Sequence, residues 1–366
     1  MNVYIPLAIL SIILALFARN NTRRASVIFF VVMLAALVFA AIRFEFGPDY
    51  FQYRDMYDRL QSIGVDGYLS SNEHIEPLFL VILRAFPSFF LFIATQSILW
   101  FVSIYLFLKN RCDFRFLWLV VFLLYFDVNN ILNNYVAIRS SLVGIIFLVA
   151  LPYLKDKKIV YVLLMILAFF IHNSSAPLIL LALFNGNKKQ NAESYNFLYI
   201  LTIIVGFISF FFGDIISGPM TEYLIDMFPQ AFGKYSYYME NVFTERSISI
   251  GNFIFLSMRI YIIFMLIGGL RQEKKSEYVL FYKIAILMSL LSILFGNMLM
   301  SRFNMNVAPL MIVAYIRSLR YLRTDFSFLF VGSLIIISLF AFYGILHADF
   351  SISFLEYHSI IGQPVH

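Results

Sequence analysis

The chain has 366 residues, of which 61% are hydrophobic and 13% charged, with one cysteine and a net charge of +6. A soluble domain is about a quarter charged, so this composition excludes an ordinary water-soluble protein. Apolar runs near the ~20 residues of a membrane-spanning helix recur along the chain, and runs such as 27–41 lack the alternation of a β-barrel. We therefore predict an all-α polytopic membrane protein with a single transmembrane domain over residues 1–366, with the lipid bilayer and no nucleic acid as partner.

The basic residues predict the orientation of the chain. No positive charge precedes the first apolar stretch, 3–18, and three arginines follow it. Positive loops stay in the cytoplasm, so the N-terminus is predicted outside. Six basic clusters hold 18 of the 27 Lys and Arg residues. They are Arg19/Arg23/Arg24, Lys109/Arg111/Arg115, Lys155/Lys157/Lys158, Lys188/Lys189, Arg271/Lys274/Lys275/Lys283 and Arg317/Arg320/Arg323. One cytoplasmic loop per cluster gives about twelve spans and an outer C-terminus.

Nine basic residues lie outside these clusters, and because orientation does not need them they are the first candidates for chemistry. They are Arg43, Arg54, Arg59, Arg84, Arg139, Lys234, Arg246, Arg259 and Arg302. Arg54, Arg59, Lys234 and Arg246 are expected to be solvated loop charges.

Three predicted hairpins are too short to cross the bilayer fully. Between Lys158 and Lys188 lie 29 residues, so each arm of about 13 residues reaches ~20 Å, short of the ~30 Å hydrocarbon core. The polar apex, 172–177, must then be buried in protein or line a wet cavity. The alternative is one long crossing, which would invert the topology downstream.

Two further hairpins carry polar residues at their apex. The apolar arm 116–127 is followed by four asparagines and Arg139, and a polar section at 297–306 precedes Arg317. Ionisable residues at membrane depth are functional candidates. We expect one outward-facing cavity where Arg139, His172 and Arg302 converge, with Arg259 at its floor.

Two long outer loops are predicted, 43–75 and 213–250. The first opens with Arg43, Asp49, Tyr50 and Tyr53, and closes before Glu76-Pro77. Residues 76–86 are predicted to form an interfacial helix and 88–108 a crossing. The aromatic residues of both loops suit either sugar binding or the membrane-interface belt.

The ordered set of motifs resembles the EpsG family of bacterial exopolysaccharide proteins, which are Wzy-type polymerases. The motifs are Arg43-x3-Gly47-x-Asp49-Tyr50-x2-Tyr53, Glu76, Arg139 within 134–142, His172 within 168–176, and Arg302 after a polar break. A glutamine often follows the arginine in the family, whereas this chain has Ser140.

The resemblance implies a GT-C-like glycosyltransferase of the bacterial inner membrane. Such proteins polymerise oligosaccharides linked to undecaprenyl pyrophosphate, which serve as donor and acceptor at the outer face, and they work beside a flippase and a chain-length regulator. Because arginine suits phosphate oxygens, we expect Arg139, Arg302 and Arg259 to bind the pyrophosphate. Arg43, Tyr50 and Tyr53 complete the predicted substrate-binding set.

His172 is the best candidate general base, with Asp49 and Glu76 as the others. The sequence has neither Asp-x-Asp nor a Cys/His pair at ligand spacing, so we expect no metal and no cofactor. Simpler roles stay open: Asp49 and Glu76 as helix starts, His172 at a helix break, the arginines in structural ion pairs.

Three other functions compete with the polymerase. An O-antigen ligase would move a finished glycan from the same lipid carrier to another acceptor. A membrane-bound O-acyltransferase would use the His172-Asn173 pair from the cytoplasmic side. A flippase for lipid-linked sugars would show two related halves, and no such symmetry is visible in the sequence.

Overall fold

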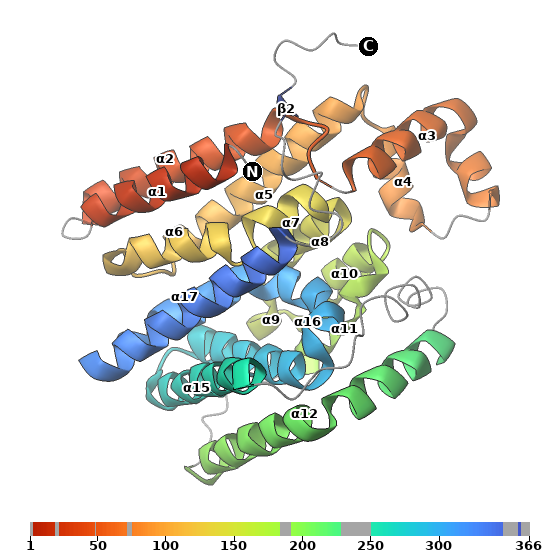
Figure 1. The fold of residues 1–366 in the computed structure, drawn as a ribbon. Helices are drawn as coiled ribbons and strands as arrows, with labels where there is room; N and C mark the ends of the chain where they lie inside the picture. Colours follow the sequence, from red (N-terminus) through yellow and green to blue (C-terminus); the bar gives the residue numbers. More distant parts are fainter. Residues whose placement is uncertain are drawn as a thin grey trace. The chain divides into compact units, whose positions relative to one another are not determined.

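The computed structural model describes residues 3–18, 22–47, 49–71, 75–183, 192–227, 250–346 and 358–359. Nearly all of them are helical (Figure 1), which confirms the all-α prediction. The chain forms two compact units, residues 1–182 with 338–366 and residues 183–337. Among the described residues, six helices are long and apolar enough to cross a membrane, so the protein is a multi-pass membrane protein.

Four apolar helices open the first unit. They are α1 (Tyr4–Phe17), α2 (Thr22–Ala41), α5 (Phe89–Lys109) and α6 (Leu117–Phe126), the last preceded by the 3-10 turn η1 (Phe114–Phe116). Helix α1 packs beside α2 and α6, and α2 packs on α5 (Figure 1). Helix α5 begins where the sequence predicts the crossing, because the Ser88 side chain accepts the N–H of Leu91 at 3.2 Å and caps the first turn.

The predicted outer loop 43–75 is largely helical. Helix α3 (Tyr50–Ser70) is followed by α4 (Pro77–Arg84), which begins after Glu76 as predicted. The short strand β1 (Arg43–Phe44) pairs antiparallel with β2 (His358–Ser359) near the C-terminus. The sequence did not predict the length of α3, because charged residues lie between the residues of its apolar side.

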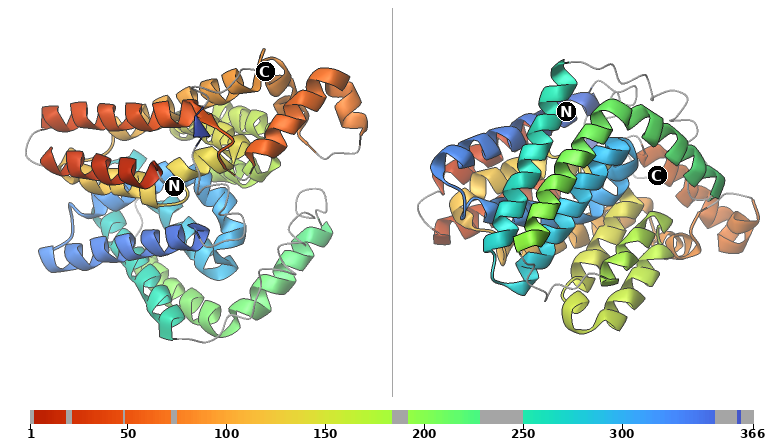
Figure 2. Two further views of the ribbon diagram at one scale, coloured as in Figure 1. Left: turned by 45° about the horizontal axis from the view of Figure 1, so that its top comes forward. Right: turned by 90° about the horizontal axis from the view of Figure 1, so that it is seen from below.

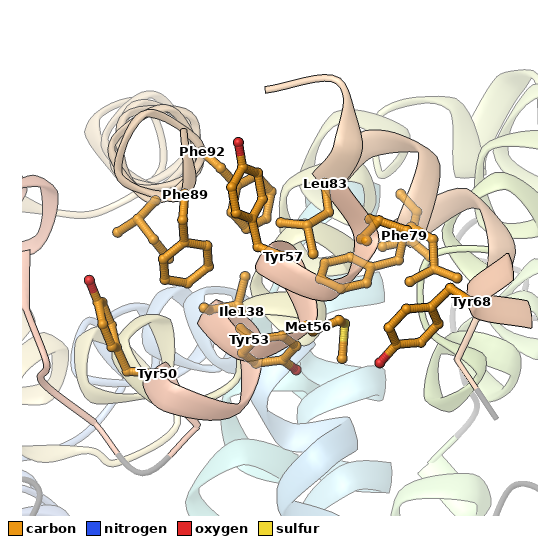
Figure 3. Close-up of a cluster of buried hydrophobic side chains, with 14 residues drawn as sticks. Tyr50, Tyr53, Met56, Tyr57, Tyr68, Phe79, Leu83, Phe89, Phe92 and Ile138 are labelled. Atoms are coloured by element: carbon orange, nitrogen blue, oxygen red, sulfur yellow. The ribbon is translucent and has the colours of Figure 1, made fainter. Parts of the chain in front are cut away.

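Helix α3 buries one face against α4 and α5. Tyr53, Met56, Tyr57 and Leu60 recur at helical spacing and belong to one buried cluster with residues of the neighbouring helices (Figure 3). The Tyr57 hydroxyl also donates to the backbone oxygen of Phe86 at 2.9 Å. This packing holds α4, and with it Glu76, on the first unit.

The described chain turns back at His172, as the short-hairpin prediction requires. Helix α10 (Lys158–Phe169) has 12 residues and leads to η2 (Asn173–Ser175), α11 (Ala176–Ile179) and η3 (Leu180–Leu183). The Lys158 ammonium donates to the backbone oxygen of Ala182 at 2.8 Å, and the Tyr161 hydroxyl to that of Leu178 at 2.6 Å. These contacts bring the two arms together. Lys188 and Lys189 lie outside the described residues.

The remaining helices of the first unit carry the second polar hairpin. They are α7 (Ile131–Val136), α8 (Ile138–Ala150) and α9 (Tyr153–Asp156). Helix α6 ends at Phe126, and the chain turns through Asp127, whose carboxylate accepts the backbone N–H of Asn129 at 3.1 Å.

The second unit contains α12 (Ala192–Met227), α15 (Ile250–Gln272), α16 (Ser276–Ser318) and the start of α17 (Thr324–Leu346). Helices α12, α15 and α16 pack side by side (Figure 2). The first part of the predicted outer loop 213–250 is therefore helical, and the aromatic residues predicted within 228–249 lie outside the described residues.

Helix α16 folds back on itself. The Asn304 side chain donates to Ser292 Oγ at 2.9 Å, although twelve residues of straight helix would separate them by about 18 Å. The Ser318 hydroxyl likewise reaches Tyr282 OH at 3.3 Å. The chain thus reverses between Ser292 and Asn304, where the sequence predicts a polar apex.

The basic clusters at the ends of this hairpin share one side of the second unit. Arg317 bonds Glu273 through two nitrogens, at 2.6 and 2.7 Å, and its guanidinium lies 3.4 Å from the ring centre of Tyr278. In the first unit, Phe29 of α2 contacts Phe114 of η1 with ring centres 5.4 Å apart.

Candidate functional site

The Glu76 carboxylate is the centre of a polar site in the first unit. Glu76 precedes Pro77 at the start of α4, with extended backbone angles, and its side chain makes no capping bond to α4. The carboxylate turns instead to Arg139, His172 and the backbone of Asn173. Its side chain is 12% exposed. Glu76 lies at the start of a helix, which was its predicted simpler role, but its side chain bonds Arg139 and His172 of other elements.

His172 and Asn173 hold one carboxylate oxygen of Glu76. His172 Nδ1 lies 3.1 Å from Oε1, and the N–H of Asn173 donates to the same oxygen at 2.9 Å. Both groups come from the apex of the α10 hairpin, where the helix stops and the backbone becomes extended at His172. The His172 side chain is 3% exposed. The helix break thus points a ring nitrogen and a backbone donor at one acceptor.

Arg139 holds the other oxygen of Glu76. Arg139 Nη1 lies 2.6 Å from Oε2, and Nε donates to the hydroxyl of Tyr53 at 3.1 Å. The guanidinium also lies 5.8 Å from the ring centres of Tyr53 and Phe79. Arg139 is the second residue of α8. The site therefore joins α3, α4, α8 and the α10 hairpin, which are far apart in the sequence.

The charges of this site keep Glu76 ionised. Burial by itself would raise the pKa of the Glu76 carboxyl, but the hydrogen bond from His172 and the charge of Arg139 outweigh burial and lower the pKa to about 2. A carboxylate with so low a pKa is a weak proton acceptor at neutral pH. Glu76 is therefore suited to orienting its partners.

Arg43 belongs to a second polar network, buried within the first unit. Its side chain is fully buried, with Nη1 3.3 Å from Ser97 Oγ and Nη2 3.3 Å from the backbone oxygen of Asn134. The Asn134 side chain accepts from Gln96 Nε2 at 2.5 Å. Arg43 thereby ties β1 to α5 and α7, and its predicted role in binding substrate stays a prediction.

The other predicted site residues lie elsewhere. Asp49 is the residue before α3 and makes no side-chain capping bond there, and it is not among the partners of Glu76. Tyr50 is buried, with its ring 5.3 Å from that of Phe89. Arg259 and Arg302 belong to the second unit, and their convergence with His172 stays a prediction.

Sequence reasoning missed the buried amide of Gln96 beside the site. Gln96 lies between Thr95 and Ser97 inside the apolar span α5, and this short polar run carries no motif. Its place at membrane depth was the available signal, because polar side chains there need partners. Among the described residues, no group of three His, Cys, Asp or Glu side chains could hold a metal.

Fold and site together define a multi-pass helical membrane protein with a buried Arg–Glu–His cluster. The family model of the EpsG family matches residues 26–359. The chain therefore belongs to the EpsG family, whose members resemble Wzy-type polymerases, and membership indicates a membrane polysaccharide polymerase of the glycosyltransferase-like kind. No curated protein and no solved structure matches the chain.

Proposed function

We propose that the protein polymerises oligosaccharide repeat units carried on undecaprenyl pyrophosphate, at the outer face of the bacterial inner membrane. The observation that carries the proposal is the convergence of Arg139 and His172 on Glu76, with Tyr53 bonded to Arg139. A glycosyl transfer to a hydroxyl needs a base for the acceptor and a cation for the leaving pyrophosphate. The cluster offers both chemistries a few ångströms apart.

His172 is the general base in this proposal. The ionised Glu76 carboxylate accepts a hydrogen bond from Nδ1–H, which leaves Nε2 as the unprotonated nitrogen of the neutral ring. Nε2 takes the proton of the acceptor hydroxyl while that oxygen attacks the anomeric carbon of the donor. The bond between this carbon and the pyrophosphate oxygen breaks, and undecaprenyl pyrophosphate leaves. Glu76 orients His172 in this proposal, because a carboxylate with so low a pKa is a weak base.

Arg139 binds the leaving pyrophosphate. Nη1 and Nε are engaged by Glu76 and Tyr53, whereas the described residues offer Nη2 no partner. The side chain is 14% exposed, so this amino group is available to a phosphate oxygen. Because Glu76 offsets part of its charge, further cations are required, and Arg302 and Arg259 remain the proposed ones. The reaction uses no metal in this proposal.

Twelve spans and a GT-C-like architecture belong to the same proposal. The described residues contain twelve apolar segments. They are the six long helices, four shorter apolar helices, the second arm of α16 and the returning segment 176–183. Helix α2 begins at Arg23 and Arg24, which are cytoplasmic in this proposal, so β1, which follows its other end, is outside. The pairing of β2 with β1 therefore supports an outer C-terminus.

Purified protein in liposomes containing lipid-linked repeat units tests the function. The wild-type protein is expected to form glycan ladders without a second acceptor, whereas a ligase would form none. His172→Ala and Arg139→Ala are expected to lose more than about 99% of the rate, since general-base and charge stabilisation each contribute about a hundredfold or more. Normal ladders from either variant would refute its assigned role.

Arg115→Ala is the matched control for the loss of an arginine. Arg115 is paired with Asp113 at 2.7 Å, but its side chain is 65% exposed, and it lies in a predicted cytoplasmic cluster. Its variant is expected to keep the wild-type ladder. Equal loss of ladders in Arg115→Ala and Arg139→Ala would show that the assay reports general damage to the protein.

A further inference from the structure

Gln96 connects α7 with α8, the helix that carries Arg139. Its side chain is 1% exposed inside α5. Nε2 donates to Asn134 Oδ1 on α7 at 2.5 Å and to Ser141 Oγ on α8. The Ser141 hydroxyl in turn donates to the backbone oxygen of Ile138 at 2.8 Å. One amide nitrogen thus bonds residues that stand seven positions apart.

These two bonds are possible because the helix is broken between Asn134 and Ser141. Ala137 separates α7 from α8 with φ −104° and ψ 71°. In a continuous helix, seven residues span about 10.5 Å, and the side chains lean the same way along the axis, so the two oxygens would stay about that far apart. Two acceptors of one amide nitrogen lie at most about 6 Å apart. The Gln96 bridge therefore favours the broken conformation over a continuous helix.

The break at Ala137 determines where Arg139 points. Arg139 follows it by two residues and reaches Glu76 and Tyr53 from the first turn of α8. We propose that Gln96 is a positioning residue for Arg139, acting through its bonds to Asn134 and Ser141. The inference rests on the proposed function of Arg139 and adds a residue that contacts none of the groups around Glu76.

The bridge leaves two of its buried polar atoms without a partner among the described residues. Gln96 Oε1 and Asn134 Nδ2 are buried with no hydrogen-bond partner among the described residues. An unpaired buried polar atom costs stability, so an apolar side chain of the same length would remove one such atom together with the two bonds. The removed atom raises stability and the lost bonds lower it, so the two effects on stability oppose each other. A positioning role therefore predicts a loss of rate with little loss of stability, whereas a packing role predicts that both fall together.

The test compares Gln96→Met, Gln96→Glu and a control, Gln52→Met, at an exposed position of α3. Gln96→Met is expected to lower kcat for ladder formation about tenfold to a hundredfold with a smaller change in KM, since small misplacements of a positioned group have effects of this size. Its melting temperature is expected to stay within about 3 °C of wild type. Gln96→Glu can accept from the Asn134 amide and the Ser141 hydroxyl, and is expected to recover most of the rate.

Hydrogen exchange at the start of α8 gives a readout that does not need activity. The N–H of Ser141 bonds the oxygen of Ala137 at 2.9 Å, and it is expected to exchange faster in Gln96→Met but not in Gln52→Met. If wild type forms no ladders, the proposed function fails, while this difference would still uphold the bridge. Wild-type rate and exchange in Gln96→Met would overturn the inference. So would parallel losses of rate and melting temperature that Gln96→Glu does not recover.

Discussion

Replacing Glu76 by Gln removes the one carboxylate that Arg139 and His172 share. The pKa of Glu76 falls from 4.5 to about 2 in the folded protein. At about 1.36 kcal/mol per pKa unit, the ionised carboxylate stabilises the fold by about 3 kcal/mol, a value typical of a buried ion pair that loses one partner. For a domain of this size we expect the melting temperature of Glu76→Gln to fall by about 6 to 10 °C at pH 7.

The difference in stability between wild type and Glu76→Gln is expected to decrease as the pH falls. Because the folded-state pKa of Glu76 is lowered, its stabilisation is complete above about pH 4.5 and is lost as the pH falls toward 2. At pH 3 about 1 kcal/mol remains. The difference in melting temperature between wild type and Glu76→Gln, measured by intrinsic fluorescence in a non-ionic detergent, should therefore be less than half its value at pH 7.

Glu45→Gln is the matched control. Glu45 pairs with Arg54 at 3.4 Å, but the two side chains are 36% and 39% exposed, and exposed pairs contribute about 0 to 1 kcal/mol. Its melting temperature should stay close to that of wild type. If Glu76→Gln behaves like Glu45→Gln at pH 7, or if its deficit is unchanged at pH 3, the reasoning about Glu76 is wrong.

Two further predictions test the backbone around the site and the hairpin of α16. Gly47 has φ +101° and a Cβ there would lie 2.8 Å from a backbone oxygen of α7, so Gly47→Ala should lower stability by about 1 to 3 kcal/mol in thermal unfolding. Gly332→Ala, with nothing within 4 Å of its Cβ, should not, and equal melting temperatures for the two variants would contradict the prediction. In a cysteine-free background, Ser292→Cys with Asn304→Cys should cross-link on oxidation, because these side chains touch. A straight α16 would leave that pair of cysteines free on a gel.

Much of the fold was predictable because each segment carries its own signal. Apolar runs and basic clusters predicted the helices and the turn at His172, and the predicted crossing 88–108 matches α5. The length of helix α3 was not predicted, because its buried face is made of tyrosines, methionine and leucine among charged residues. Its role becomes clear only when α4 and α5 cover that face (Figure 3).

The sequence also selected Arg139 and His172 as candidates, since ionisable groups at membrane depth are functional candidates, and the outer-loop motifs with their family resemblance added Glu76 and Tyr53. It could not decide their roles. Only the tertiary structure brings His172 and Arg139 to opposite oxygens of one carboxylate, and that contact lowers the pKa of Glu76 and makes it a weak proton acceptor. The physical reason is that hydrogen bonds and charge effects act over a few ångströms. The distances between residues 53, 76, 139 and 172 are decided by packing, which no local pattern records.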